Sequence, residues 1–325
     1  MLKRFELSNS VLIPSVSSDS PILVFVNPDA SEKQMLLSNF SIDEHTLLSA
    51  LDHDEVPRIE IDSDAISLIW KRPMNYSGQD NFYFNVASVG LFMFKDRLAI
   101  VLTEDISIAP TGARKVQRLD SLTNVLLSFL YETIYHYLEH LKVIKMISRD
   151  IQQKINTSME NKHLIQMFNL SESLVYYTDA ISGNNAVLIR LRSHAEKSGF
   201  APPVLDLLDD LIIENNQCFK QAEIYSTVFS GLMDARGTLV NNNMNVLLKN
   251  LTIINVVFLP LNLIASIGGM SEFSMMTGDI DWWISYSLFF TAMVAIGWLT
   301  AFFLGKMDFA SKKISKGRRK ARTVQ

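Results

Sequence analysis

The sequence predicts an α+β membrane protein with an N-terminal α/β cytoplasmic domain, long stalk helices and a C-terminal hairpin of two transmembrane helices. Three observations lead to this prediction. Short β-like runs fill the first third of the 325 residues, long helical patterns begin at about Asp120, and two stretches without a charged side chain lie near the C-terminus. These stretches, 250–271 and 282–305, each reach the ~20 residues that a helix needs to cross a bilayer core.

Six segments follow from these patterns. They are an α/β domain at 1–115, a helical stalk at 116–249, a first transmembrane helix at 250–271, an outer acidic loop at 272–281, a second transmembrane helix at 282–305 and a basic tail at 306–325. In the first segment, apolar or alternating runs predict strands at 21–26, 58–62, 66–70, 89–94 and 98–102. Helical spacing predicts one helix over 31–51, and the last two strands form a hairpin, so we expect a mixed or antiparallel sheet.

The stalk is predicted to consist of long helices. We expect interruptions near 157–161, at 183–185 and at Pro202-Pro203. No proline follows until Pro260, so the pattern predicts one helix from Val204 to about Met270, roughly 100 Å long at 1.5 Å per residue. One subunit of this size cannot bury such a helix, and we therefore expect self-association along its length.

Charge is sorted along the chain. Residues 1–248 carry 21 basic and 30 acidic side chains, whereas the tail carries eight basic side chains and one acidic side chain. Positive charge next to a span marks the cytoplasmic side, and a hairpin brings the N-terminal part to that same side. We expect a multi-pass protein of the cell inner (plasma) membrane, in contact with lipid and with both termini in the cytoplasm. Cys218 is the only cysteine, which excludes an intramolecular disulfide and a cysteine-based zinc cluster.

A polar stripe follows the end of the long predicted helix. Steps of three and four residues give Asn241, Asn245, Leu248, Thr252, Asn255, Leu259, Asn262, Ser266 and Gly269. One interpretation is a dry interface in which helices hydrogen-bond to one another, and the other is a water-filled pore lined by this face. A pore requires several copies around an axis.

The side chains of the stripe indicate what such a pore would pass. Rings of neutral oxygens, separated by Leu248 and Leu259, suit a cation that keeps its water, as Mg²⁺ does. Asp234 lies on the same seven-residue phase and predicts a ring of carboxylates at the inner mouth. A solvated helix residue is the alternative for Asp234.

Several motifs resemble the CorA family of divalent-cation transporters. They are found at 25–28, 57–61, 224–226, 230–234, 244–254, 258–261 and 264–271. The resemblance covers nearly the whole chain. It implies a homopentamer with a cytoplasmic funnel, in which the long helix lines a central pore and the second span forms an outer ring.

The chain departs from the family pattern at the outer mouth of the pore. The family has Gly-Met-Asn there, whereas this chain has Gly269-Met270-Ser271. A shorter hydroxyl replaces an amide, which changes how a hydrated ion is held. Because magnesium uptake in the family is tied to that Asn, the replacement favours the zinc-transporting branch, which resembles ZntB, with Mg²⁺ or a Co²⁺/Ni²⁺/Mg²⁺ range as the alternative. Glu272, Asp279 and Asp281 in the outer loop attract any divalent cation and do not choose among them.

Two further groups have metal-ligand chemistry. His136 and His140 lie four residues apart on one helix face, a spacing that can hold Zn²⁺ and that ordinary surface histidines also show. Asp52-His53-Asp54 and Asp209-Asp210 are candidates for an intersubunit cation site of the kind that the family uses for regulation. Solvated surface residues are the alternative for both acidic segments.

The sequence gives no indication of an enzyme. It has no phosphate-binding glycine loop, no nucleophile with a recognisable base and no ATP motif. We therefore expect no nucleotide, no nucleic acid and no cofactor, and the transported cation, Zn²⁺ or Mg²⁺, as the bound ion. The rival class is a membrane-anchored metal sensor or scaffold without ion flux.

Overall fold

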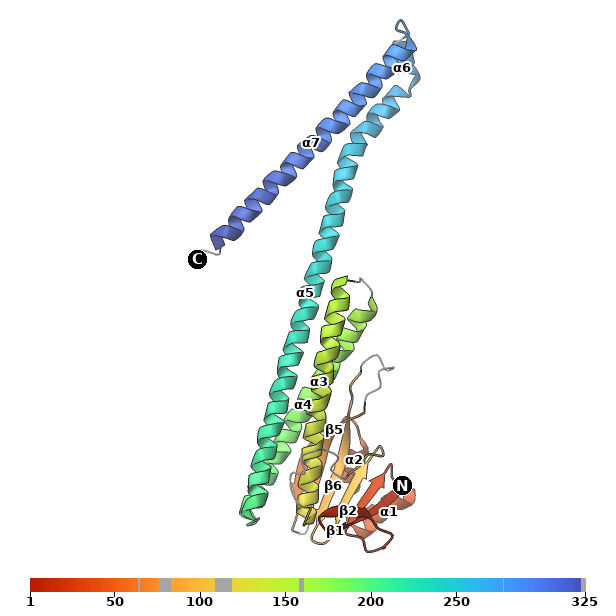
Figure 1. Ribbon diagram of the computed structural model, residues 1–325. Coiled ribbons are helices and arrows are strands. Elements are labelled where there is room, and N and C mark those ends of the chain that lie inside the picture. The colour runs from red at the N-terminus through yellow and green to blue at the C-terminus, as the bar shows by residue number, and fades with distance from the viewer. Residues whose placement is uncertain (64, 76–82, 109–118, 158–160, 277, 323–325) are drawn as a thin grey trace. The chain divides into compact units, whose positions relative to one another are not determined.

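The computed structural model describes residues 1–325 except 64, 76–82, 109–118, 158–160, 277 and 323–325. For residues 155–157, 161, 272–274, 301, 303–305 and 307–322 it describes the backbone alone. The elements in chain order (Figure 1) are β1 (Leu2–Ser8), β2 (Val11–Pro14), β3 (Ile22–Val26), α1 (Ala30–Asn39), α2 (Glu44–Leu51), β4 (Arg58–Ile61), β5 (Ala65–Pro73), β6 (Val86–Phe94), β7 (Leu98–Leu102), α3 (Leu122–Thr157), α4 (Asn161–Lys197), α5 (Pro202–Gly268), α6 (Ser271–Met276) and α7 (Trp282–Arg322).

The strands form one mixed sheet, as predicted. Its order is β2-β1-β3-β7-β6-β5-β4. β3 pairs with β7 in parallel, and the other neighbouring strands pair antiparallel. The β1–β2 hairpin turns through Asn9 and Ser10, whose φ angles of 51° and 61° are the left-handed conformation that a tight two-residue hairpin turn requires.

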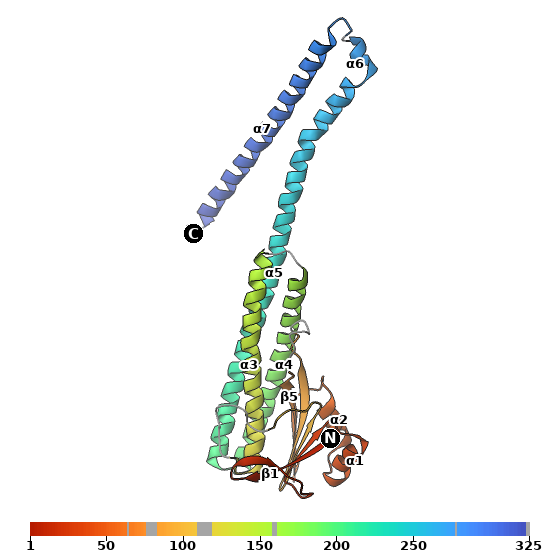
Figure 2. The ribbon, with the colours of Figure 1, turned by 45° about the vertical axis from the view of Figure 1, so that its right-hand side comes forward.

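Helices cover both faces of the sheet (Figure 2). α1 and α2 lie on one face, and α3 and α4 lie on the other. Alternate side chains of β3 therefore enter different cores: Leu23 and Phe25 pack beneath α1 and α2, while Ile22, Val24 and Val26 join the core that contains α3, α4 and the first part of α5. Because both faces are buried, every position of β3 is apolar, which explains the continuous apolar run in the sequence.

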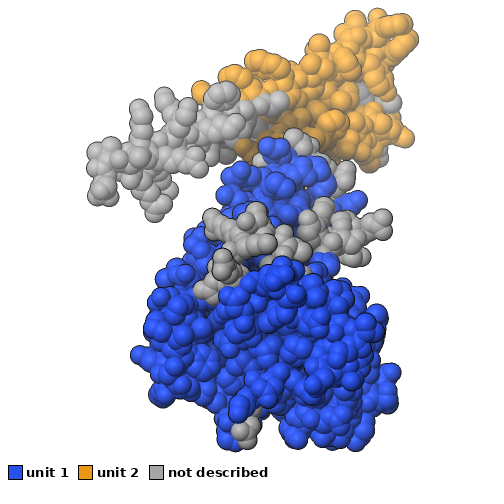
Figure 3. Space-filling model, turned by 60° about the horizontal axis from the view of Figure 1, so that its bottom comes forward, with its two compact units in different colours: residues 1–233 blue, residues 234–325 orange. Residues whose placement is uncertain are grey.

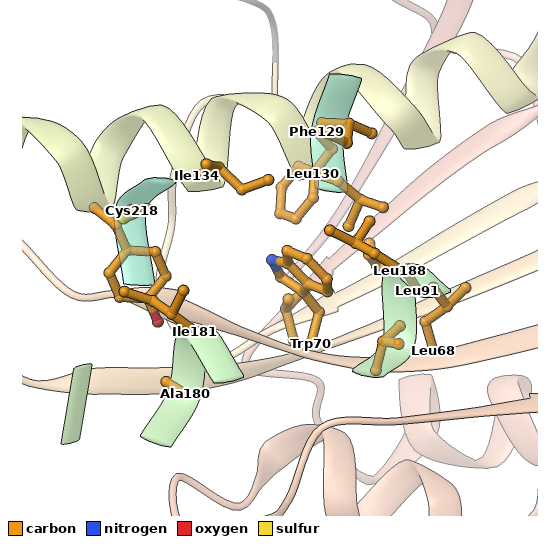
Figure 4. Close-up of a cluster of buried hydrophobic side chains, with 14 of the residues drawn as sticks. Leu68, Trp70, Leu91, Phe129, Leu130, Ile134, Ala180, Ile181, Leu188 and Cys218 are labelled. Carbon is orange, nitrogen blue, oxygen red and sulfur yellow. The ribbon is translucent and has the colours of Figure 1, made fainter. Parts of the chain in front are cut away.

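The larger core surrounds Trp70 of β5 (Figure 4). The side chains around this fully buried indole come from the sheet and from three helices: Leu68, Leu91, Phe129, Leu130, Ile134, Ala180, Ile181, Leu188 and Cys218. Apolar burial of this extent is the main favourable contribution to folding. One face of the sheet, α3, α4 and the first part of α5 therefore share this core.

The predicted helix over 31–51 is wrong in one respect, because the structure has two helices there. α1 begins with Asp29 and Glu32 in a reciprocal capping box. The chain then turns at Ser41, which has a φ of 51°, and Asp43 caps α2 by accepting a hydrogen bond from the Thr46 amide. The polar residues at 41–43, read as part of one helix, instead form the turn between the two helices, and Asp43 starts the second.

The interruption predicted at 183–185 is also wrong, because α4 is continuous through these residues. Gly183 lies against the loop before β4: a Cβ on it would come within 2.7 Å of Pro57 Cγ. Next to it, the buried Asn184 amide accepts from the Lys71 backbone N–H at 3.0 Å and donates to the Lys71 carbonyl at 2.8 Å. Glycine and asparagine are present here because the helix approaches the sheet closely and hydrogen-bonds to it.

The chain divides into two compact units, Met1–Met233 and Asp234–Gln325, which are coloured separately in Figure 3. The boundary falls within α5, a helix of 67 residues that continues through Pro260 as predicted. It begins at Pro202 and ends at Gly268, close to the expected ends. The division into six segments, with its boundary at 115/116, stays a prediction.

Candidate ion pathway

The polar side chains of the predicted pore share one face of α5. We use the name pore stripe for Asp234, Asn241, Asn245, Leu248, Thr252, Asn255, Leu259, Asn262 and Ser266, all of which belong to the second unit. All nine are exposed in the single chain. At 3.6 residues per turn, they fall within an arc of ~100°. The stripe is therefore a single continuous surface.

The opposite side of α5 contacts α7 within the second unit. A Cβ on Gly268 would lie 2.5 Å from Phe289 Cζ, and a Cβ on Gly297 would lie 3.3 Å from Leu261 Cδ1. Helical geometry places Leu261 and Gly268 roughly 150–170° from the middle of the pore stripe. The stripe thus points away from α7 and is free to face other copies of the chain.

The threonine of the stripe presents an acceptor. Thr252 Oγ1 donates to the Leu248 carbonyl at 2.8 Å, so the helix uses its proton. The hydroxyl lone pairs remain available on the exposed side. Together with the amide oxygens of Asn255 and Asn262, they give the stripe a set of neutral oxygen acceptors.

The C-terminal end of α5 closes in a tight turn. The Gly269 amide donates to the Ala265 and Ser266 carbonyls at 3.1 and 3.2 Å, and the Met270 amide donates to the Ile267 carbonyl at 3.1 Å. Ser271 then starts α6 and is exposed. The turn therefore presents Met270 and Ser271 directly beyond the last residue of α5.

The acidic residues of the loop between α5 and α7, which was predicted to be the outer loop, are exposed where the structure describes them. Asp279 and Asp281 line a hollow of about 390 Å³ together with Gly278, Ile280, Trp282, Ser285 and Tyr286. The side chain of Glu272 lies outside the described residues. Asp281 directly precedes α7, and its carbonyl accepts from the amides of Ile284 and Ser285.

Of the two histidines on α3, His140 is buried in the first unit and His136 is half-buried. His140 is 4% exposed, and its Nδ1 lies 2.6 Å from Tyr177 Oη. Burial, with a smaller effect of His136, lowers the pKa of His140 to about 3, so its ring is neutral. The interpretation as surface histidines is wrong for His140, which is buried, whereas His136 is half-buried. A zinc site at this pair stays a prediction. In the part of the chain that the structure describes, no group of three or more His, Cys, Asp and Glu side chains is placed to hold a metal ion.

The second candidate cation site is only partly free. Asp209 accepts from Arg192 Nε and Nη2 at 2.9 and 3.3 Å, whereas Asp210 is exposed. An intersubunit cation site at these residues stays a prediction. Lys71 and Gly268 could not be recognised from the sequence alone. A lysine next to an apolar run resembles a surface residue, and a glycine beside Gly269 resembles part of a turn.

Among the described residues, two helices are long and apolar enough to cross a membrane, α5 and the part of α7 from Trp282 to Thr300. The most apolar window of each is almost entirely unburied, at 6% and 0% buried. Core helices of soluble proteins bury such windows. The exposed apolar surface is therefore typical of helices in contact with lipid.

Comparisons with known proteins agree with this architecture. The cobalt/magnesium transport protein CorA of Methanocaldococcus jannaschii is 22% identical over 256 residues, which cover 75% of this chain and 78% of that protein. The complete structure of the CorA magnesium transporter from the same organism has a TM-score of 0.72 at 19% identity and matches 93% of this chain and 96% of its own. The ZntB cytoplasmic domain from Vibrio parahaemolyticus has a TM-score of 0.55 at 12% identity and matches 75% of this chain and 97% of its own. Residues 20–307 match the family described as CorA-like Mg2+ transporter protein, and the chain belongs to that family.

Proposed function

We propose that this chain transports divalent metal cations through a central pore formed by the pore stripes of several copies. As a member of the CorA-like family it is a divalent-cation transporter and not an enzyme. The observation that supports the pore is the placement of the stripe, exposed and facing away from α7. We propose a homopentamer in the inner membrane, with both termini in the cytoplasm, from the resemblance to the family and the basic tail.

The chemistry of the stripe suits a hydrated ion. The oxygens of Asn and Thr side chains accept hydrogen bonds from the water around a cation, while Leu248 and Leu259 narrow the path between polar rings. A divalent ion that dehydrates reluctantly passes such rings with its water. Asp234 supplies negative charge where the first residues of the stripe begin.

Two ions are candidates, each favoured by one observation. Ser271 in place of the family's Asn favours Zn²⁺, because the residue tied to magnesium uptake is absent. The name of the Methanocaldococcus jannaschii relative favours Mg²⁺ or Co²⁺. We place Zn²⁺ first, since the position of Ser271 directly after the turn lets its side chain contact an entering ion.

Flux measurements in proteoliposomes test the pore. We expect Asn255→Leu and Asn262→Leu to abolish Zn²⁺ and Mg²⁺ flux, because each replaces a ring of acceptors by an apolar ring. Asn250→Leu is the matched control, since Asn250 lies on the α7 side of α5 by helical geometry. Size-exclusion chromatography with light scattering checks that all variants keep the same oligomer. Unchanged flux in both stripe variants would contradict the pore and favour a sensor or scaffold.

A second variant tests ion selectivity separately. We expect Ser271→Asn to shift the ratio of Mg²⁺ to Zn²⁺ flux towards Mg²⁺ without stopping transport. An unchanged ratio would show that Ser271 does not discriminate between the ions.

A further inference from the structure

An aromatic ring of α7 lies against Gly268, the last residue of α5. Gly268 is buried, whereas Ile267 and Met270 beside it are exposed. A Cβ on Gly268 would lie 2.5, 2.8 and 3.1 Å from Cζ, Cε1 and Cε2 of Phe289, so the end of the ring occupies the space that a side chain would need. Glycine at this position therefore lets the ring approach the helix backbone.

The neighbours of Phe289 show that its ring is directed at α5. Phe289 is half-buried, whereas the next residue, Phe290, is 66% exposed. Ser285, four residues before Phe289, is buried, and Gly297, eight residues after it, lies close to Leu261 of α5. Residues four apart share one face of a helix, so α7 packs on α5 through this face, and Phe289 belongs to it.

The ring of Phe289 lies behind the pore stripe. Ser266, the last residue of the stripe, precedes Gly268 by two positions and so points roughly 160° away from it around the helix. A ring packed on Gly268 therefore supports α5 from the side opposite to the proposed pore, at the level of Ser266. In an assembly of identical copies, every copy carries this support at the same level.

The turn that follows α5 is built on the end of the same helix. The amides of Gly269 and Met270 donate to carbonyls of the last turn of α5. Ser271 comes three residues after Gly268, a distance of at most about 11 Å along an extended chain. The placement of Met270 and Ser271 is therefore tied to the placement of Gly268.

We propose that Phe289 is a positioning residue of the pore mouth. Its ring, packed on Gly268, sets how far Ser266 and Ser271 lie from the pore axis and thereby how well the mouth distinguishes one hydrated divalent cation from another. The distance is decisive because a hydroxyl binds the water of an entering ion only within hydrogen-bond range. This inference rests on the proposed pore and adds to it a residue of α7, which is not part of the stripe.

Flux measurements on the full-length protein in proteoliposomes test the proposal. Zn²⁺ and Mg²⁺ uptake are measured over a range of concentrations, which separates the maximal flux from the half-saturating concentration. Phe289→Ala removes the ring behind Gly268. We expect its half-saturating concentrations to rise and its Zn²⁺-to-Mg²⁺ flux ratio to move towards one, each by at least about twofold, the lower end of the coupling between residues in contact. Phe290→Ala, the same change at the exposed neighbouring residue, is the matched control and is expected to behave like the wild type.

A second substitution tests whether the contact itself is responsible. When Gly268→Ala is combined with Phe289→Ala, the new Cβ fills part of the space that the ring leaves, since it would lie 2.5 Å from the former position of Cζ. We expect the double variant to recover part of the wild-type flux ratio. If Phe289→Ala does not fold, Phe289→Leu takes its place, and we expect a smaller shift in the same direction because leucine lacks the end of the ring.

Light scattering of the detergent-solubilised protein checks that all variants keep the wild-type oligomer. A wild-type protein without flux would overturn the proposed transport and this inference with it. With wild-type flux present, the positioning role alone would be overturned if Phe289→Ala behaved like Phe290→Ala, or if it lowered the maximal flux of both ions by the same factor at unchanged half-saturating concentrations. A double variant without any recovery would also overturn it, because the contact with Gly268 is then not responsible.

Discussion

We expect truncation of the buried Asn184 side chain to lower the free energy of unfolding of the protein strongly. Asn184 is fully buried and makes two hydrogen bonds, at 3.0 and 2.8 Å, to the backbone of Lys71. In Asn184→Ala, one N–H and one C=O in the interior lose their partners, and each costs about 1–3 kcal/mol. The expected loss is about 2–6 kcal/mol, which corresponds to a fall in Tm of roughly 4–24 °C for a unit of this size.

The assay is the thermal unfolding of the full-length protein in detergent, followed by circular dichroism. Asn216→Ala is the matched control, because Asn216 is exposed on α5 and alanine is the better helix former. Hydrogen exchange of the peptide that contains Lys71 gives a local readout, since its amide loses the acceptor Asn184 Oδ1. Equal midpoints in Asn184→Ala and Asn216→Ala, with unchanged exchange at Lys71, would refute the reasoning.

Three other predictions follow from close contacts and one buried ring. Gly183→Ala, whose Cβ would lie 2.7 Å from Pro57, is expected to lower stability by about 1–3 kcal/mol, measured as a lower denaturant midpoint. Gly268→Ala, whose Cβ would lie 2.5 Å from the Phe289 ring, is expected to lower the Tm of the oligomer, and Phe289→Leu in the same chain is expected to restore part of the loss. Burial lowers the pKa of His140 to about 3, whereas a histidine in the unfolded chain titrates near its ordinary value of 6.5. The contribution of the neutral ring to the stability of the fold is therefore complete above pH 6.5 and is lost as the pH falls below that value. The slope of this fall is at most ~1.4 kcal/mol per pH unit, and denaturant titrations at a series of pH values should find it reduced in His140→Gln.

The central strands could be predicted from the sequence because their burial leaves a plain pattern. β3 and β7 are apolar at every position. Each run is too short to show the periodicity of an amphipathic helix, so the pattern indicates a buried strand. β1 was not predicted as a separate strand, since Lys3, Arg4 and Glu6 on it give it the composition of a loop. Near the sheet edge those charges reach solvent, so tertiary position and not composition decides the strand.

The end of β5 was missed for the opposite reason. The expected strand stopped at Trp70, because Lys71 and Arg72 are charged residues that normally end a buried run. The structure buries both: Lys71 is bonded to His53 and Asn184, and Arg72 Nη2 contacts Glu104 Oε2 at 3.0 Å. Each partner is distant in the sequence, and no local pattern predicts that such partners exist.

The pore stripe could be predicted because it depends on one helix alone, but its two interpretations could not be separated. A dry interface between helices in a membrane relies on small residues that let the backbones approach closely. The structure places such residues, Gly268 and Gly297, at the contact between α5 and α7, on the side away from the stripe. The stripe itself carries Asn and Leu side chains, which hold neighbouring backbones apart. Close packing thus lies on the side of α5 that faces α7. This separation supports the proposal that water, and not direct contact, lies between the stripes of neighbouring copies.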